Sequence, residues 1–292
     1  MQQVVVVGVD GSKDGLVALA WAAEYAGRRH WRLRVVHVLH DLTPAEHLAP
    51  AMAQVLPAGD GTDILEETAA ELVRLGRHGV PASFEIRHGH PGRTLLEIGR
   101  TAGMLVVGRR GMEGFAELML GSTSQLCAAL ATGPVVVVTE SWRPDGPHTG
   151  RIVVGVDGTG PSRPAVDFAF ATASRYGAAL VAVHAMRMPD LFPSTDMWLN
   201  PDDPPWSARL ELLVAETMAG WSEQYPEVAV EQRIVPGHPV QVLAAESAAA
   251  DLVVVGGAAR ERFTALRLGS VSRGLLHHAA CPVAVIHEEG TP

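Results

Sequence analysis

The sequence predicts an α/β fold class, with two tandem doubly wound domains that each hold a five-stranded parallel sheet flanked by four helices. One observation is a repeat: VVVVGVDGS at residues 4–12 returns as RIVVGVDGT at residues 151–159, and residues 108–137 share 12 identical positions with residues 256–285. A period this long is a domain length, so the chain is a tandem duplication. The other observation is that apolar runs alternate with helical patterns in each half, which is typical of right-handed β-α-β crossovers.

The domains are predicted at residues 1–142 and 151–288, joined by a linker at residues 143–150. The stretch around this linker, SWRPDGPHTG, is rich in Pro and Gly and interrupts the periodic patterns on both sides. A doubly wound domain binds ligands beyond the carboxyl ends of its strands, where the direction of winding reverses. Each half is therefore expected to carry its own ligand site.

In the first half, the opening run at residues 4–9 is almost entirely valine, which predicts a fully buried strand. Ser12 follows it and is suited to cap the next helix, whose apolar face runs from Leu16 to Ala26. The other strands of this half are predicted at residues 33–39, 83–88, 104–107 and 135–139. The other helices are predicted at residues 63–78, 92–100 and 122–130. The second half repeats this order, with strands near residues 151–156, 179–185, 228–235, 252–255 and 283–286.

Composition excludes several classes of protein. Of the 292 residues, 47% are hydrophobic and 19% are charged, which is enough apolar surface for sizeable cores. The net charge of −9 disfavours nucleic-acid binding through a basic face. No apolar run reaches the roughly 18 residues of a membrane helix, and the first residues lack the basic segment of a signal peptide. With two cysteines and no CxxC, a cytoplasmic location without disulfides is expected.

A glycine-rich pattern follows the fourth strand: Gly108-x2-Gly111-x9-Gly121-Ser122. Gly111 is expected to turn the backbone with a positive φ. The N–H groups at the start of the next helix, beside the Ser122 hydroxyl, would then form a cradle for phosphate. The alternative is a plain strand–loop–helix connection in which glycines make the turns and Ser122 is an N-cap. The spacing matches neither a Walker A loop nor a dinucleotide fingerprint.

Asp10 lies at the carboxyl end of the first strand, and Asp157 is its copy in the second half. On a parallel sheet this end adjoins the loop after the fourth strand. A carboxylate there can accept a hydrogen bond from an adenine amino group or a ribose hydroxyl. The alternative is a turn in which the aspartate accepts the amides of the next helix.

These features resemble the universal stress protein family in its tandem, ATP-binding form. The resemblance rests on the glycine spacing, the VGVD strand end, His37-Val38, Gly89-His90-Pro91 and Gly133-Pro134, and it covers almost the whole chain. It implies an adenine-nucleotide-binding α/β fold in which Asp10 and the backbone of Val38 hold adenine and ribose. It also implies that phosphates, with Mg²⁺ as an accompanying ion, lie along four residues of the loop: Gly108, Gly111, Gly121 and Ser122.

The second half carries the matching positions with two departures. The matching residues are Asp157, Ala185, Gly256, Ala259, Gly269 and Ser270. Ala185 replaces Val38, which is harmless where only the backbone is used. Ala259 replaces Gly111, so the second half is expected to bind ATP about tenfold less tightly, since a left-handed Ala would cost ~1–2 kcal/mol.

The resemblance implies a protein that holds ATP as a regulatory ligand in a stress response, with at most slow, incidental hydrolysis. No base for water is evident, so no catalytic residue is assigned. The alternative of a different class is a protein-interaction module that needs no nucleotide. An enzyme that transfers AMP is disfavoured, because Lys13 is the single lysine.

Other histidines and the last strand of each half complete the predictions. His37 and His184 end the second strands and are expected to be buried, hydrogen-bonded imidazoles. His88 and His90 lack a third ligand, so no metal site is assigned. The last strands, residues 135–139 and 282–286, are apolar sheet edges. Together with the resemblance, they predict an internal pseudo-dimer of the two halves, and a homodimer is also compatible with them.

Overall fold

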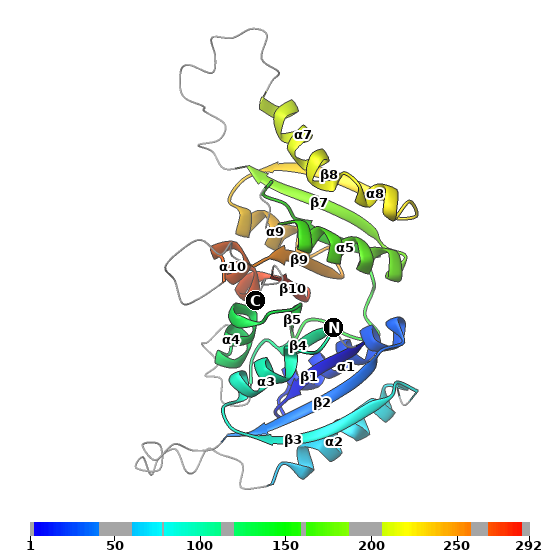
Figure 1. The fold of residues 1–292 in the computed structure, drawn as a ribbon, viewed down its shortest axis with the longest axis vertical. Coiled ribbons are helices and arrows are strands. Elements are labelled where there is room, and N and C mark those ends of the chain that lie inside the picture. Colours follow the sequence, from blue (N-terminus) through cyan, green and yellow to red (C-terminus); the bar gives the residue numbers. More distant parts are fainter. Residues whose placement is uncertain are drawn as a thin grey trace, which may run out of the picture. The chain divides into compact units, whose positions relative to one another are not determined.

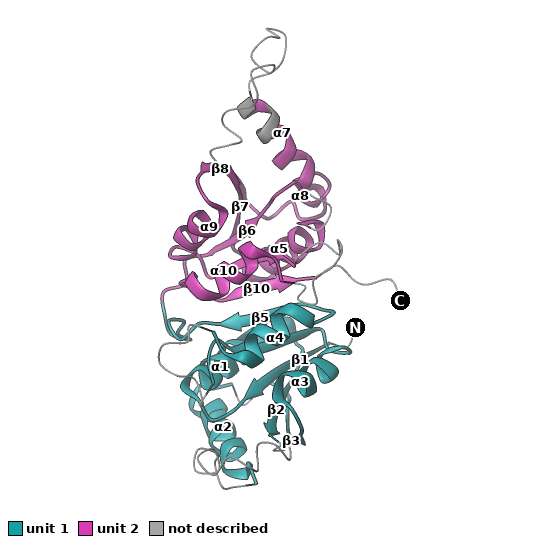
Figure 2. Ribbon diagram, turned by 90° about the vertical axis from the view of Figure 1, so that its left-hand side faces the viewer, with its two compact units in different colours: residues 1–146, 289–292 teal, residues 147–288 magenta. Residues whose placement is uncertain are grey.

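A computed structural model describes residues 3–40, 60–77, 79–111, 120–158, 162–186, 206–257 and 268–287. Figure 2 shows that these residues form two compact units, which divide between Gly146 and Pro147. Each unit is an α/β domain whose strands pair in parallel, as the sequence predicts. Within the described residues, no helix has both the length and the apolar composition needed to cross a membrane.

Unit 1 contains five parallel strands and four described helices, labelled in Figure 1. The strands are β1 (Val4–Val9), β2 (Arg32–Leu39), β3 (Ala82–His88), β4 (Met104–Gly108) and β5 (Val135–Val138). The helices are α1 (Lys13–Arg29), α2 (Thr62–Arg74), α3 (Pro91–Gly99) and α4 (Ser122–Leu130). The order in the sheet is β3-β2-β1-β4-β5. Helix α1 contacts α2, whereas α3 contacts α4, as right-handed crossovers on the two faces require.

Unit 2 repeats this arrangement with the sheet order β10-β9-β6-β7-β8. Its strands are β6 (Arg151–Gly155), β7 (Ala179–Met186), β8 (Val230–Pro236), β9 (Leu252–Gly256) and β10 (Val283–Ile286). Its described helices are α5 (Arg163–Tyr176), α7 (Trp206–Met218), α8 (Trp221–Gln224), α9 (Pro239–Ser247) and α10 (Ser270–His278). The short helix α8 is an addition to the four helices that were predicted for this half.

The predicted boundaries hold to within about two residues, except at the end of α2. That helix ends at Arg74 and not at residue 78, because Gly76 adopts a left-handed backbone with φ of 65°. A left-handed glycine shortly after the last helical residue is a common way for a helix to end. The expected serine cap of α1 is confirmed, since Ser12 Oγ accepts the Gly15 N–H at 3.0 Å.

The central strands of both units are buried on both faces, as a valine-rich sequence in a parallel sheet predicts. All five residues of β4 are buried, and so are the first four residues of β9. The winding direction reverses between β1 and β4 in unit 1 and between β6 and β9 in unit 2. The carboxyl ends of these strands are thus the places where each fold opens a crevice for a ligand.

Candidate functional site

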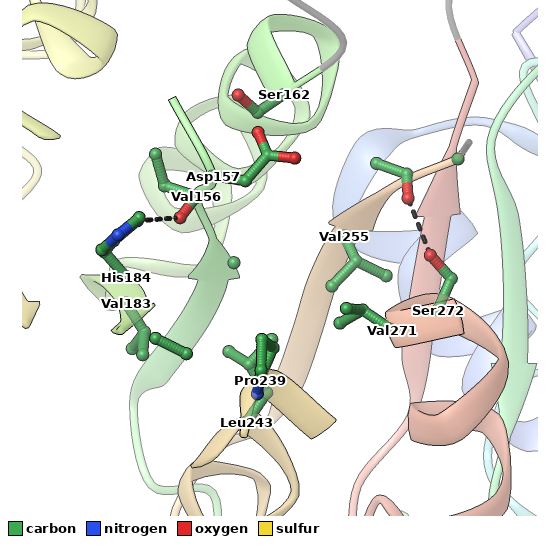
Figure 3. A pocket seen from close by; sticks show the side chains of 14 residues that line it. Val156, Asp157, Ser162, Val183, His184, Pro239, Leu243, Val255, Val271 and Ser272 are labelled. Carbon is green, nitrogen blue, oxygen red and sulfur yellow. Dashed lines mark hydrogen bonds between the residues drawn. The ribbon is translucent and has the colours of Figure 1, made fainter. Parts of the chain in front are cut away.

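Unit 2 has a cavity of about 390 Å³ at its switch point, beyond the carboxyl ends of β6, β7 and β9 (Figure 3). These strands supply its lining, together with the first turns of α9 and α10. The lining residues are Gly155, Val156, Asp157, Ser162, Val183, His184, Ala185, Pro239, Leu243, Val255, Gly256, Gly257, Val271 and Ser272. The walls are mainly aliphatic, and Asp157, Ser162, His184 and Ser272 provide the polar side chains.

Three residues predicted for this half line the same cavity. Asp157 comes from the end of β6, Ala185 from β7 and Gly256 from β9. Gly269 and Ser270 do not line it, and Ser270 is exposed at the start of α10. Ala259 lies outside the described residues. The sequence reasoning missed Pro239, although it had noted the matching Gly89-His90-Pro91 segment in the first half.

Two contacts that fix the strand ends are the same in both units. The Ser272 hydroxyl donates to the Gly256 carbonyl at 2.8 Å, and the Ser124 hydroxyl donates to the Gly108 carbonyl at 2.6 Å. These bonds tie the first turn of α10 to β9, and that of α4 to β4. The two serines are identical in the repeat, which is the signal that could have identified them.

The histidines at the ends of the second strands are hydrogen-bonded, as predicted. Nδ1 of His37 lies 2.9 Å from the Val9 carbonyl, and Nδ1 of His184 lies 2.9 Å from the Val156 carbonyl. Because a carbonyl only accepts, Nδ1 carries the proton in both rings. His37 is buried and His184 is partly exposed. Each ring joins the first two strands of its unit next to the predicted site.

In unit 1, Asp10 meets the loop after β4, as its place on the sheet predicts. Its Oδ1 accepts the Ser12 N–H at 3.0 Å, so the turn-forming role is real for this oxygen. Its Oδ2 faces the loop, because a Cβ atom added at Gly111 would lie 2.5 Å from it. The carboxylate thus forms the turn and also lies against the glycine-rich loop.

The expectation of a positive φ at Gly111 is wrong. Gly111 is not among the described glycines with a left-handed backbone. An added side chain would there collide with the Asp10 carboxylate, which would have to shift, and it would meet no left-handed backbone strain. The penalty expected for Ala259 from a left-handed conformation therefore loses its basis.

The other predicted residues of unit 1 lie around the same strand ends. Gly108 ends β4 against α1, where an added Cβ would lie 2.7 Å from the Asp14 backbone. Gly121 is the N-cap of α4, in place of Ser122, and its N–H donates to the Arg109 carbonyl at 2.9 Å. Ser122 is exposed. Val38 is half-buried near the end of β2.

Charged residues that the sequence reasoning missed surround this loop. Asp14 is only 5% exposed, and its Oδ2 accepts the Arg110 N–H at 2.9 Å and lies 3.7 Å from Arg110 Nε. The Arg110 guanidinium also pairs with Glu140. Burial raises the pKa of the Asp14 carboxyl, and the Arg110 N–H and guanidinium partly oppose this rise. Burial likewise lowers the pKa of the neighbouring Arg109.

Metal ligation and thiol chemistry find no support in the described part of the chain. No group of three or more described His, Cys, Asp or Glu side chains is arranged to hold a metal ion. The His90 ring packs edge-on against His40, with 5.8 Å between centroids. Both cysteines are free and buried, and burial raises the pKa of each thiol to about 12.

Comparison with known proteins gives a consistent result over the whole chain. The model of the universal stress protein family matches residues 1–139 and again residues 148–287. A universal stress protein of Mycolicibacterium smegmatis is 36% identical over 296 residues, covering 97% of this chain and 96% of that protein. One from Mycobacterium tuberculosis is 36% identical over 299 residues, covering 98% of each chain. The fold is shared with a crystal structure of a universal stress protein from Archaeoglobus fulgidus, with a TM-score of 0.66, 19% identity, and coverage of 99% of this chain and 100% of that chain.

Proposed function

The chain belongs to the universal stress protein family, and from that premise we propose that it binds an adenine nucleotide, with ATP as the expected ligand. The nucleotide would be held as a regulatory ligand in a stress response. One observation carries the proposal: Asp157, Ala185 and Gly256 come from three different strands and line one cavity at the switch point of unit 2. The fold positions ligands at this place.

The size and the lining of the cavity support an adenosine moiety as its occupant. Its volume of about 390 Å³ lies within the usual range of small-molecule sites. Val156, Val183 and Leu243 give apolar surfaces against which a flat base can pack. The Asp157 carboxylate can accept hydrogen bonds from an amino group or from ribose hydroxyls.

The phosphates would extend toward the first turn of α10. The N–H groups at the N-terminus of a nine-residue helix, with the helix dipole, favour an anion there. Gly269 and Ser270 would serve this part of the ligand, as Gly121 and Ser122 would at α4. Mg²⁺, where present, would be held mainly by the phosphate oxygens.

We propose a binding role and not a catalytic one. Asp157 is the one carboxylate among the described lining residues of the cavity, and its place at the end of β6 suits contact with the nucleoside. Hydrolysis needs a group that orients a water on the γ-phosphate, at the other end of the ligand. Any turnover of ATP would therefore be slow and incidental.

Equilibrium binding of ATP to the purified full chain tests the proposal. Asp157→Ala should weaken binding to unit 2 by about ten- to a hundredfold, because a hydrogen bond to a charged group contributes roughly 1.5–3 kcal/mol. Asp10→Ala should have the same effect in unit 1. Asp63→Ala is the matched control, since Asp63 is an exposed residue in the first turn of α2.

The result also distinguishes the alternative class. A wild-type chain that binds neither ATP nor adenosine at millimolar concentration would contradict the proposal and favour a protein-interaction module that needs no nucleotide. Binding that the two site variants leave unchanged would place the nucleotide elsewhere.

A further inference from the structure

A buried carboxylate lies where the loop of unit 1 would be expected to meet a phosphate. Asp14 is the second residue of α1, and its carboxylate accepts the backbone N–H of Arg110 at 2.9 Å. This amide belongs to the segment between Gly108 and Gly111, which the sequence predicts to bind phosphate. The Arg110 N–H is therefore already hydrogen-bonded to an anion of the protein itself, the Asp14 carboxylate.

The position of Asp14 is fixed by packing. A Cβ atom added at Gly108 would lie 2.7 Å from the carbonyl carbon and oxygen of Asp14, so the first turn of α1 lies directly on the end of β4. The positive end of the α1 dipole further stabilises a carboxylate at this place. This packing places Asp14 beside the loop, and the bond to the Arg110 N–H holds its carboxylate there.

Neighbouring donors of the loop are also bonded within unit 1. The Arg109 N–H donates to the Val138 carbonyl at 3.0 Å, and the Gly121 N–H donates to the Arg109 carbonyl at 2.9 Å. The Arg110 guanidinium lies between the carboxylates of Asp14 and Glu140. Together with Asp10, these carboxylates lie beside the described part of the loop, and a polyphosphate entering it would meet their repulsion.

Unit 2 differs at the corresponding positions of the repeat. Pro161 stands where unit 1 has Asp14, and Ala258 stands where it has Arg110. At these two positions unit 2 therefore has neither a carboxylate nor an arginine. This difference distinguishes the two sites by charge, although both retain the aspartate at the end of the first strand.

We propose that Asp14 determines which class of ligand unit 1 binds. Unit 1 favours an adenosine-like ligand with little phosphate charge, whereas unit 2 binds an adenine nucleotide with a polyphosphate chain. This inference rests on the proposed binding of adenine ligands by both units. ATP entering unit 1 must compete with Asp14 for the Arg110 N–H, whereas adenosine need not. The expected order of ATP affinity is thus opposite to the one inferred from Ala259.

Asp14→Asn in the full chain tests this, because the amide keeps the shape and the acceptor oxygen but removes the charge. The probes are adenosine, ATP and inorganic pyrophosphate at constant ionic strength. The amide resonances of Arg110 and Gly257 report on units 1 and 2 separately. The variant should raise the ATP affinity of unit 1 about tenfold and change its adenosine affinity less than twofold. Asp63→Asn, an exposed first-turn aspartate, should change neither.

The outcomes separate the two proposals. Equal changes for ATP and adenosine, or none, would overturn the role of Asp14 and leave nucleotide binding intact. If the wild-type chain binds neither adenosine nor ATP, the proposed function fails. The role of Asp14 is then tested by the titration with pyrophosphate. If pyrophosphate shifts the Arg110 amide resonance in Asp14→Asn but not in the wild type, the role of Asp14 as an internal anion is upheld. If it shifts this resonance in neither protein, the role of Asp14 and the proposed nucleotide binding are both overturned.

Discussion

Gly92 of α3 lies against Leu126 of α4, and a Cβ atom added at Gly92 would lie 2.8 Å from Leu126 Cδ2. In unit 2 the two sizes are exchanged: Val240 of α9 lies against Gly274 of α10, where an added Cβ would lie 2.6 Å from Val240 Cγ2. These are the same two positions of the repeat. Each unit therefore pairs one glycine with one bulky aliphatic residue in this helix–helix contact, and the two units place the glycine on opposite helices.

This exchange predicts a compensating pair of substitutions in unit 1. Gly92→Val alone should destabilise the unit by about 1–3 kcal/mol, because it overpacks the contact. Leu126→Gly alone should also destabilise the unit, by about 2–4 kcal/mol, because it removes a half-buried side chain and places a glycine in a helix. The double variant should cost less than the sum by at least about 0.5 kcal/mol, measured by urea denaturation. Additive effects would show that the two residues do not share one space.

His30 predicts a stabilising substitution at the end of α1. It adopts a left-handed backbone with φ of 55°, whereas the matching cap of α5 is Gly177 with φ of 62°. A residue with a side chain loses roughly 1–2 kcal/mol of stability in the left-handed conformation. Replacing it with glycine removes this penalty, but the greater flexibility of glycine in the unfolded chain cancels about half of the gain. His30→Gly should thus stabilise the protein by about 0.5–1 kcal/mol in thermal or urea unfolding.

The matched control is Gly177→Ala. No atom lies within 4 Å of a Cβ added there, so the backbone conformation alone should destabilise this variant. A stabilising Gly177→Ala, or a destabilising His30→Gly, would contradict the argument.

The last strand of each half carries a prediction that hydrogen exchange can check. The apolar edges and the family resemblance predict that the last strands, residues 135–139 and 282–286, meet in an internal pseudo-dimer. If they do, every amide of both strands should exchange slowly in the full chain. The edge strands β3 and β8 are the internal comparison, because alternate amides of an open edge exchange quickly. Fast exchange at alternate residues of 135–138 and 283–286 would contradict the pairing.

The two cysteines should be unreactive in the folded protein. Cys127 is fully buried and Cys281 is 6% exposed, and desolvation raises the pKa of each thiol to about 12. Since the thiolate is the nucleophile, an aromatic disulfide reagent at pH 8 should label neither until the chain is denatured. It should then label both, and labelling of the native protein at a rate near that of free cysteine would contradict the buried assignment.

The fold was predictable because its signals are local. The start of α4 at Ser122 and the strand at Val283–Ile286 were predicted to the residue, since a glycine, a serine and a β-branched run mark them. The end of α2 was missed because Gly76 and Gly79 could each have ended the helix, and it is Gly76 that adopts the left-handed backbone. Local periodicity does not show which glycine turns the chain.

The site was predictable only where the topology dictates it. Asp10 and Gly111 follow neighbouring strands of one parallel sheet, so their proximity follows from strand order. The bond between Asp14 and Arg110 joins residues 96 positions apart and depends on how α1 packs against Gly108. No pattern in the sequence encodes that packing, so the charge at the loop could be recognised only in the structure.

Asp14 also makes a prediction about stability and pH. Burial raises the pKa of its carboxyl in the folded state above the ordinary value of 3.8. The folded state then binds the Asp14 proton more tightly than the unfolded state does. The stabilisation that this proton provides is fully present below pH 3.8 and is lost as the pH rises through the folded-state pKa.

Asp14→Asn removes this dependence because the amide does not titrate. At pH 7 the variant should be at least as stable as the wild type in urea denaturation, since it no longer buries a charge whose desolvation outweighs its pairing with Arg110. As the pH falls toward 3.8, the wild type should gain stability relative to the variant. The difference between their free energies of unfolding should disappear once Asp14 is protonated. Asp63→Asn, which alters an exposed aspartate, is the control for general charge effects. A variant that loses stability at pH 7 by more than about 1 kcal/mol would show that the Arg110 pair outweighs the cost of burial.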